Sequence, residues 1–483
     1  MLSTLFKIKN FIINNYLKII LVGLCSLFVF LLFYGFPDSP SPWFDEGINL
    51  GIARSFAEKG VYNMAVGPNQ YVNEKQLMIT TNYPLLLPVS LAFKLLGTGF
   101  WQAKIIMISY LLLFVFLVFR LVKKNYGEKQ ALMSLALLIV FLPLYGNGKS
   151  VLGEIPGLVF ILSGLLFLDK EKKWLVLLTG LFFGLGASTK PLYLLFVLSL
   201  LVCEVFFAAK QKKINFSRWL FLFLGGFLPL LIWLLTIIPS KLDPASLYNF
   251  FVYYRNPYSV DVGVAINKNL IRFFTESTPV HFLLLFVAFV ASKIIERRFK
   301  KMEIVLLFFI LLDLFFYVKT AGWYRYFFPA HVLLFILFPH SLLVITDKIK
   351  NKYIRKYGAV LIIGLLFFVQ SFNLLSNFNS KLYYNPQPRR LGEVINKMIS
   401  ANKDILVVHN PALAFFIKSD NVWQYLAINP YLTSGKEWFT DGSFPDYLVI
   451  GPGSEMLLKD EKVLKAYRLI LEEGKLSLFK KRP

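Results

Sequence analysis

Cysteine is nearly absent from this sequence, which has two cysteines in 483 residues. Cys25 and Cys203 both fall within long apolar stretches, so we expect no disulfide framework of the kind that holds small secreted domains together. Histidine is also scarce. The four histidines are scattered, and none is spaced from another as metal ligands are. A histidine-based zinc site is therefore not supported.

Acidic residues are few, with 28 Asp and Glu against 52 Lys and Arg and a formal net charge of +24. Such an excess would suggest a nucleic-acid partner, but the basic residues form short clusters between apolar runs instead of one surface patch. Hydrophobic residues make up 57% of the chain, and the mean hydropathy of +0.60 lies far outside the range of soluble proteins. The composition predicts a multi-pass membrane protein with no nucleic-acid partner.

Eleven apolar stretches predict membrane helices, several of them short for a bilayer that needs about 20 residues. They cover about residues 17–36, 99–122, 130–146, 151–168, 174–189, 191–209, 218–239, 279–295, 302–319, 326–346 and 354–375. Every second loop is short and basic, and the positive-inside rule places these loops and the N-terminus in the cytoplasm. The segments 37–98 and 240–278, and the chain after residue 375, are then expected outside, as eleven spans require.

A helix is predicted over residues 43–59, directly after the first span. Ser41 is a favourable N-cap and Pro42 suits the first helical position. From Phe44 to Phe56 every fourth residue is apolar, which gives one apolar stripe. Gly60 is expected to end the helix in the left-handed conformation.

Asp45 and Glu46 lie in the first turn of this helix, at the edge of the membrane. Ionisable groups are expensive there, so a functional interpretation is the default. The positive end of the helix favours ionised carboxylates, which suits a general base or a cation ligand. Neighbouring helical residues point about 100° apart. We therefore expect Asp45 to be the reacting group and Glu46 to support it, although both could simply complement the helix dipole.

Each outer segment is expected to carry a helix lying at the membrane surface. In the first segment the apolar stretch after Tyr83-Pro84 ends at Gly97 and is too short and proline-broken for a span. The 240–278 loop, which contains Tyr253, Tyr254, Arg255 and Tyr258, is expected to be similar. Two such helices above a helical bundle would form a cavity at the outer face.

Residues 376–483 have a different character and are predicted to form a small extracytoplasmic α/β domain, whereas residues 1–375 form the membrane domain. Residues 405–408 and 447–450 are expected to be buried strands, flanked by helices at about 389–401 and 455–466. Residues 467–471 and 476–479 are expected to pair as a hairpin. The domain has no glycine-rich nucleotide loop, since Gly451-Pro452-Gly453 lacks the dinucleotide pattern.

Further charged and aromatic residues fall at the outer ends of the predicted spans. Glu154 and Lys149 lie near the start of one span, Lys190 lies between two, and Arg325 and Tyr326 begin another. Each has an ordinary explanation on its own, because lysine and arginine extend toward the membrane surface and tyrosines collect there. Their convergence at one depth on one side favours a functional site.

These motifs resemble the C-type (GT-C) integral-membrane glycosyltransferases over about residues 37–345. Within that class the chain is most similar to the branch of protein O-mannosyltransferases, lipid A aminoarabinose transferases and Rgt-like enzymes. The motifs are Trp43-Phe44-Asp45-Glu46, Tyr83-Pro84-Leu85-Leu86-Leu87, Gly153-Glu154-Ile155-Pro156, Thr189-Lys190-Pro191 and Arg325-Tyr326-Phe327-Phe328-Pro329. The acidic pair is the most specific of them.

The resemblance implies a polyprenyl-phosphate-linked sugar donor and an acceptor at the outer face of the cell (inner) membrane, where the acceptor is a lipid, a glycan or a protein. A direct displacement with one base would invert the anomeric centre. The residues expected to act are Asp45 as general base, Glu46 as its support, Lys190, Arg325, Tyr326 and Lys149 at the donor phosphate, and Glu154 and Tyr83 near the acceptor. A divalent cation held by Asp45 and Glu154 is left open.

Three other functions compete with glycosyl transfer. A lipid or sugar transporter (flippase) would explain the bundle and its charges, but the sequence has no internal repeat, and the large outer loop and C-terminal domain are asymmetric. A ligase or polymerase of lipid-linked glycans usually relies on Arg and His in a large outer loop. Here the 240–278 loop has Arg255 and Arg272 but no histidine. A non-catalytic scaffold would tolerate the loss of Asp45.

Overall fold

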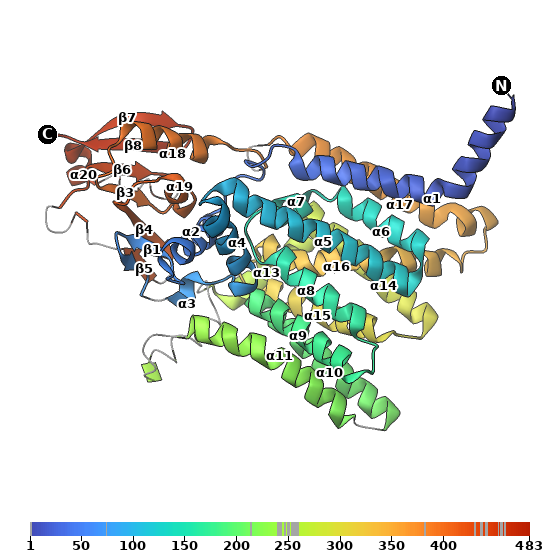
Figure 1. The fold of residues 1–483 in the computed structure, drawn as a ribbon. Helices are drawn as coiled ribbons and strands as arrows, with labels where there is room; N and C mark the ends of the chain where they lie inside the picture. The colour runs from blue at the N-terminus through green and yellow to red at the C-terminus, as the bar shows by residue number, and fades with distance from the viewer. Residues whose placement is uncertain are drawn as a thin grey trace.

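The computed structural model describes residues 2–73, 75–212, 215–238, 244–245, 248, 252, 260–380, 383–428, 431–434, 438–439, 443–452, 454, 457 and 460–483. Long helices run side by side in a bundle, and a smaller domain that contains strands sits at one end of it (Figure 1). The N-terminal end of the first helix lies at the opposite end of the bundle. The short helices of residues 44–96 lie between the bundle and the C-terminal domain.

All eleven apolar stretches are helical, as predicted. They are α1 (Leu2–Phe33), α5 (Phe100–Tyr126), α6 (Glu128–Ile139) with α7 (Leu142–Gly148), α8 (Glu154–Phe167), α9 (Lys173–Thr189), η1 (Pro191–Tyr193) with α10 (Leu194–Gln211), α11 (Phe216–Ile237), α14 (Ser277–Glu296), α15 (Lys301–Lys319), α16 (Tyr324–Thr346) and α17 (Lys352–Asn377). Within the described residues, seven helices are long and apolar enough to cross a membrane. The pair α6 and α7, bent by 72°, makes an eighth if it is one span. The chain is therefore a multi-pass helical protein, and the count of eleven spans stays a prediction.

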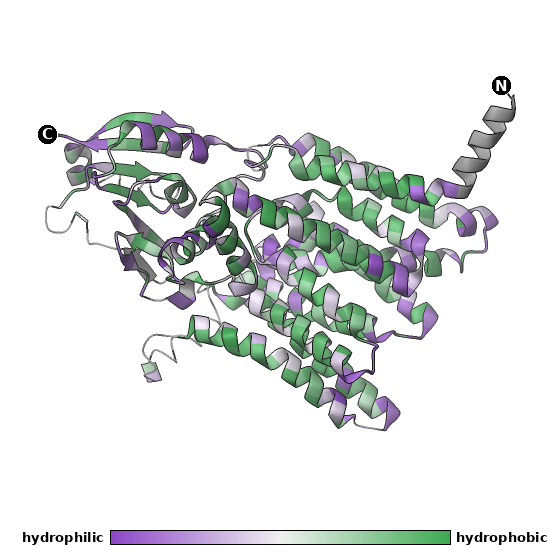
Figure 2. Ribbon diagram, viewed as in Figure 1, coloured by the Kyte–Doolittle hydropathy of each residue, from purple (hydrophilic) through white to green (hydrophobic). Residues whose placement is uncertain are grey.

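The outer surface of the bundle is apolar, as a lipid-facing surface must be. On α17, Phe368 and Leu375 are 70% and 76% exposed. Burial of such side chains is the main force that folds a chain in water, so their exposure to water on this scale would be costly. Figure 2 shows hydrophobic residues along the helices and hydrophilic ones at their ends and on the C-terminal domain.

The first outer segment forms α2 (Phe44–Lys59), the hairpin β1 (Ala65–Gly67) and β2 (Gln70–Tyr71), α3 (Lys75–Met78) and α4 (Tyr83–Leu96). Gly60 ends α2 in the left-handed conformation, as predicted. The predicted N-cap was wrong. Trp43 is the N-cap, and neither Ser41 nor Pro42 takes its predicted place, because the Glu46 carboxylate accepts a hydrogen bond from the Trp43 amide at 3.4 Å and closes the first turn there.

The second outer segment contains α13 (Val262–Thr275), which begins where the Asp261 side chain accepts a hydrogen bond from the Val264 amide at 2.8 Å. A helix was predicted in this segment. Tyr253, Tyr254, Arg255 and Tyr258, which were expected to accompany it, lie outside the described residues.

The C-terminal domain has a mixed sheet whose strand order is β5-β4-β3-β6-β8-β7. Central strand β3 is parallel to β4 and β6, and the other neighbours are antiparallel. The elements are α18 (Gln387–Met398), β3 (Ile405–Val408), α19 (Pro411–Phe416), β4 (Val422–Ile428), β5 (Tyr431–Ser434), β6 (Tyr447–Ile450), α20 (Glu461–Ala466), β7 (Tyr467–Glu473) and β8 (Leu476–Lys481). The strands β3 and β6, the hairpin of β7 and β8, and the helices α18 and α20 were predicted, whereas α19, β4 and β5 were not.

The C-terminal domain packs directly on the first outer segment. An alanine Cβ at Gly47 of α2 would lie 2.2 Å from the backbone nitrogen of Ala412 in α19, so the two helices touch where α2 has no side chain. The Gln424 side chain donates a hydrogen bond to the carbonyl of Ala65 in β1 at 2.8 Å. These contacts fix α2, and with it the acidic pair, between the bundle and the domain.

Candidate active site

The Asp45 carboxylate is ion-paired with the Arg325 guanidinium, which comes from the first turn of α16. Asp45 is the second residue of α2 and its side chain is 25% exposed, whereas that of Arg325 is 8% exposed. The predicted base and a predicted phosphate-binding cation, 280 residues apart in sequence, therefore meet in the folded chain.

Aromatic rings hold Arg325 in place. Its guanidinium carbon lies 4.9 Å from the centre of the Trp323 ring and 4.8 Å from that of Tyr326. Its Nη2 also donates a hydrogen bond to the Tyr326 hydroxyl at 2.9 Å. The ammonium of Lys190 lies 5.1 Å from the centre of the same Tyr326 ring. Both predicted phosphate-binding cations thus contact one tyrosine, in the range of cation–π interactions.

Lys190 is ion-paired with Glu154, and this pair is buried more deeply than Asp45 and Arg325. The Glu154 side chain is 0% exposed and that of Lys190 is 7% exposed. The hydroxyl of Tyr193 donates to the Glu154 carbonyl and holds the start of α8. We call Asp45, Arg325, Tyr326, Lys190 and Glu154 the charged array. It contains two cations and two carboxylates, and each cation is paired with one carboxylate.

The loops that carry the array are joined through their backbones. The Asn82 amide donates to the Thr189 carbonyl at 3.0 Å. A Cβ at Gly153 would lie 3.2 Å from that carbonyl oxygen, tighter than an ordinary contact. Tyr83, predicted near the acceptor, begins α4 beside this junction, and its hydroxyl donates to the Pro229 carbonyl of α11 at 3.3 Å. The structure therefore places Tyr83 at the start of α4, beside the junction with the loop that carries Lys190.

Glu46 points away from Asp45 into the protein. Its side chain is 0% exposed and pairs with Lys104 of α5 at 2.7 Å, where Lys104 is 1% exposed. The same carboxylate accepts the Val151 amide at 2.8 Å. Glu46 therefore anchors the first turn of α2 to α5 and to the loop before α8. This geometry fits the predicted supporting role as a positioning residue.

Lys149, a further predicted phosphate ligand, lies elsewhere, in the loop between α7 and α8. Its ammonium donates to the Tyr34 carbonyl at 3.0 Å and to the Ser39 hydroxyl at 3.3 Å. Burial, with a smaller contribution from Lys104, lowers the pKa of Lys149 to about 7. Because its ammonium binds these two oxygens, the geometry favours a structural role for Lys149.

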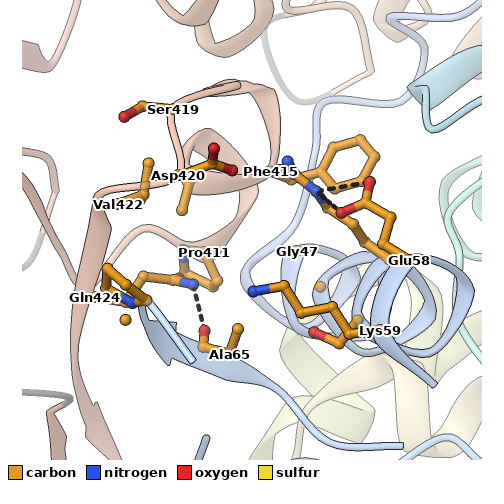
Figure 3. A pocket seen from close by; sticks show the side chains of 16 residues that line it. Gly47, Glu58, Lys59, Ala65, Pro411, Phe415, Ser419, Asp420, Val422 and Gln424 are labelled. Carbon is orange, nitrogen blue, oxygen red and sulfur yellow. Dashed lines mark hydrogen bonds and ion pairs between the residues drawn. The ribbon is translucent and has the colours of Figure 1, made fainter. Parts of the chain in front are cut away.

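A cleft with both polar and apolar lining lies between α2 and the C-terminal domain (Figure 3). It is lined by Gly47, Gly51, Arg54, Ser55, Glu58 and Lys59 of α2, by Ala65, Gly67 and Pro68 around β1, and by Pro411, Ala414, Phe415, Ser419, Asp420, Val422 and Gln424 of the C-terminal domain. Both signs of charge line it, and Arg54 pairs with Glu58 at 3.2 Å. Asp45 does not line this cleft, so the cleft and the charged array are separate features of the same helix.

The carboxylates expected to hold a divalent cation do not fit one as they stand, because Asp45 and Glu154 are each paired with a cation of the protein. Another cluster, Glu296, Glu303 and His340, brings three potential ligands together. Lys293 already bridges its two glutamates at 2.5 and 2.8 Å. This cluster also lies away from the charged array. His340 is about 22 Å from Arg325 along α16, at the helical rise of about 1.5 Å per residue.

Two buried charges escaped the sequence predictions. Lys104 is the partner of Glu46, and Asp313 lies 0% exposed in α15. Asp313 lies within electrostatic range of Lys190 and Tyr193. The sequence contained a signal for both residues. Each interrupts an apolar stretch that was predicted to cross the membrane, where ionisable groups are rare.

Comparison with known proteins first gives a family. Residues 85–235, from α4 to α11, match the family of dolichyl-phosphate-mannose-protein mannosyltransferases. The matched segment contains Glu154 and Lys190 of the charged array. No curated protein matches the sequence.

Solved structures share the fold over almost the whole chain. ArnT from Cupriavidus metallidurans in the apo state has a TM-score of 0.59 at 12% identity, and the match covers 95% of this chain and 97% of ArnT. ArnT bound to undecaprenyl phosphate has a TM-score of 0.60 at 11% identity, with the same coverage. The archaeal oligosaccharyltransferase AglB from Archaeoglobus fulgidus, in complex with an inhibitory peptide and a dolichol-phosphate, has a TM-score of 0.57 at 11% identity. That match covers 91% of this chain and 70% of AglB.

At these identities the structural likeness shows the fold, including that of the C-terminal domain. The family match relates the segment from α4 to α11 to the mannosyltransferase family in sequence. The resemblance found in the sequence is confirmed by both. Residues 85–235 match the dolichyl-phosphate-mannose-protein mannosyltransferase family, and almost the whole chain has the fold of the ArnT structures.

Proposed function

We propose that this chain transfers a sugar from a polyprenyl-phosphate-linked donor to an acceptor at the outer face of the membrane, with inversion at the anomeric carbon. The observation that carries the proposal is the charged array, in which a partly exposed carboxylate lies beside two cations. ArnT bound to undecaprenyl phosphate and AglB in complex with a dolichol-phosphate support a lipid-phosphate ligand for this fold.

Asp45 is the general base of the proposed reaction. The acceptor hydroxyl oxygen attacks the anomeric carbon of the donor, and the bond from that carbon to the phosphate oxygen breaks with its electron pair on the phosphate. The hydroxyl proton passes to Asp45, whose 25% exposed side chain lets an acceptor approach. General-base assistance is worth about 10²–10⁴-fold in rate, and the oxocarbenium-like transition state resembles that of glycoside hydrolysis.

Arg325 and Lys190 bind the donor phosphate and stabilise the negative charge that develops on it. Their shared contact with Tyr326, at 4.8 and 5.1 Å, places both cations beside one site. Arginine suits this role because its planar guanidinium can meet two phosphate oxygens at once. Glu154 holds Lys190, and we route no step through a metal ion.

The proposed orientation places the N-terminus in the cytoplasm and the C-terminal domain outside, with eleven spans in the cell membrane. The short basic loops support this orientation through the positive-inside rule. The first outer segment and the C-terminal domain lie together at one end of the bundle (Figure 1), as one outer face requires.

The test compares the purified wild-type chain with Asp45→Asn. Radiolabelled undecaprenyl-phosphate sugars are offered with a crude envelope fraction as the source of acceptors, and the release of lipid phosphate is measured together with label on the acceptor. We expect transfer by the wild type and a loss of about 10²–10⁴-fold in the folded variant. Glu58→Gln makes the same chemical change on the same helix, about 20 Å away at about 1.5 Å per residue, and should leave transfer unchanged.

Equal transfer by wild type and Asp45→Asn would remove Asp45 from its role and direct attention to Glu154. If no donor is consumed but lipid moves across vesicles that contain the protein, the transporter is the better explanation.

A further inference from the structure

In the charged array, the groups that the substrates need are already paired with one another. The two carboxylates are paired with the two cations that the donor phosphate needs, and one of these carboxylates, Asp45, is the base that the acceptor needs. We infer that Asp45 is an internal competitor for the donor phosphate, and that donor binding draws Arg325 away from Asp45 and so frees the base. This inference rests on the proposed function and assigns the order in which its substrates bind.

The two ion pairs differ in burial, and this decides which of them opens. The Glu154 side chain is 0% exposed, so loss of Lys190 would leave a buried charge without compensation. Asp45 is 25% exposed, so water can solvate its carboxylate when Arg325 leaves. Arg325 is therefore the cation that changes partner, whereas Lys190 stays with Glu154 and adds its positive field.

The surroundings of Arg325 suit an exchange of partners. The rings of Trp323 and Tyr326 hold its guanidinium at 4.9 and 4.8 Å, independently of Asp45. The same Tyr326 ring lies 5.1 Å from the ammonium of Lys190. A phosphate that binds beside Tyr326 thus meets both cations, and Arg325 exchanges one oxyanion for another without losing its aromatic contacts.

The exchange makes binding ordered. Before the donor arrives, Arg325 binds one oxygen of the carboxylate that must accept the hydroxyl proton. After the donor binds, that oxygen is released beside the anomeric carbon that the acceptor attacks. The acceptor therefore binds productively only after the donor, and water is not activated at an empty site.

The test measures binding of radiolabelled undecaprenyl phosphate to the full-length chain in detergent. Because Asp45→Asn removes the competing charge but keeps the side-chain shape, we expect it to bind the lipid about fivefold more tightly than the wild type, the fold-change that about 1 kcal/mol of a partly exposed ion pair gives. Arg325→Ala should bind more weakly. The double variant should bind like Arg325→Ala alone, since the competitor matters only through Arg325. Glu58→Gln on the same helix should leave binding unchanged.

The inference is overturned if Asp45→Asn binds the lipid equally or more weakly, the result expected if Asp45 held the phosphate through a bound cation. The inference is also overturned if Asp45→Asn still raises the affinity for the lipid in the Arg325→Ala background. It is overturned as well if neither the wild type nor Asp45→Asn binds the lipid. Asp45→Ser repeats the test if the Asn variant does not fold. Failure of the proposed function looks different, because the wild type would then transfer no sugar whatever the order of lipid affinities.

Discussion

Two adjacent carboxylates of α2 have opposite surroundings, and this difference defines the site at the scale of single residues. Asp45 is paired with Arg325, and a quarter of its side chain is exposed. Glu46 is fully buried, where Lys104 and the Val151 amide bind it at 2.7 and 2.8 Å. One acid is placed to meet substrate, and the other fixes the helix that presents it.

We expect Glu46→Gln to destabilise the folded protein by about 3–5 kcal/mol, because it leaves the buried ammonium of Lys104 without a countercharge. Thermal unfolding in detergent measures this change. Combining Glu46→Gln with Lys104→Met removes both charges and should recover most of the loss. Asp45→Asn is the matched control and should unfold near the wild-type temperature. The side chain at position 45 stays in contact with water, and Arg325 keeps its contacts with the rings of Trp323 and Tyr326. Equal stability of Glu46→Gln and the wild type would contradict the anchoring role.

The 100° between helical neighbours was enough to predict that the two acids address different atoms, and the fold agrees. The local sequence did not determine which acid would face inward. That depends on Lys104, 58 residues further along the chain, and therefore on how α5 packs against α2.

At the scale of elements, α2 is held between the bundle and the C-terminal domain. Its apolar stripe, with Ile48 and Ile52, packs beside Met64 and Leu86 of the first outer segment and Leu426 of β4. Its glycine face meets α19 at Gly47. The periodicity and Gly60 were enough to predict the helix and its end. The sequence did not reveal α19 or β4, because the glycine that admits α19 looks like any other glycine within a helix.

We expect Gly47→Ala to lower both stability and transfer. The new methyl group would lie 2.2 Å from the Ala412 backbone, which cannot move as a side chain can, and overpacking of this kind costs about 1–3 kcal/mol. Asp45 is two residues away on the same turn, so a shifted α2 also displaces the base. The measurements are the unfolding temperature and the rate of label transfer.

The control for this prediction is Gly51→Ala, one turn further along α2. Its new methyl group would meet only Met64, at an ordinary 3.8 Å. Alanine also favours the helix over glycine by about 1 kcal/mol, so this variant should be as stable as the wild type or more so. If the two variants behave alike, contact with α19 does not position α2.

For the whole molecule, composition and the alternation of basic loops predicted a helical membrane protein with an outer domain, and the fold bears out the helices and the domain. The array was predicted as a convergence of Asp45, Glu154, Lys190 and Arg325 on one side, and these residues do meet. The pairing within it was not predicted. Charges predict which end of a helix faces which compartment, whereas ion pairs depend on side-chain distances that only the packed bundle sets.

Orientation in the membrane gives the last prediction, and it uses the two exposed glutamates Glu171 and Glu461. Glu461 begins α20 of the C-terminal domain, with a side chain that is 83% exposed, and Glu171 is exposed in the basic loop between α8 and α9. With Cys25 and Cys203 replaced by serine, we expect Glu461→Cys to react with an impermeant maleimide in intact cells. Glu171→Cys should react only after the membrane is opened. The reverse pattern would place the charged array on the cytoplasmic side, where an acceptor at the outer face could not reach Asp45, and the proposed reaction would then need a cytoplasmic acceptor.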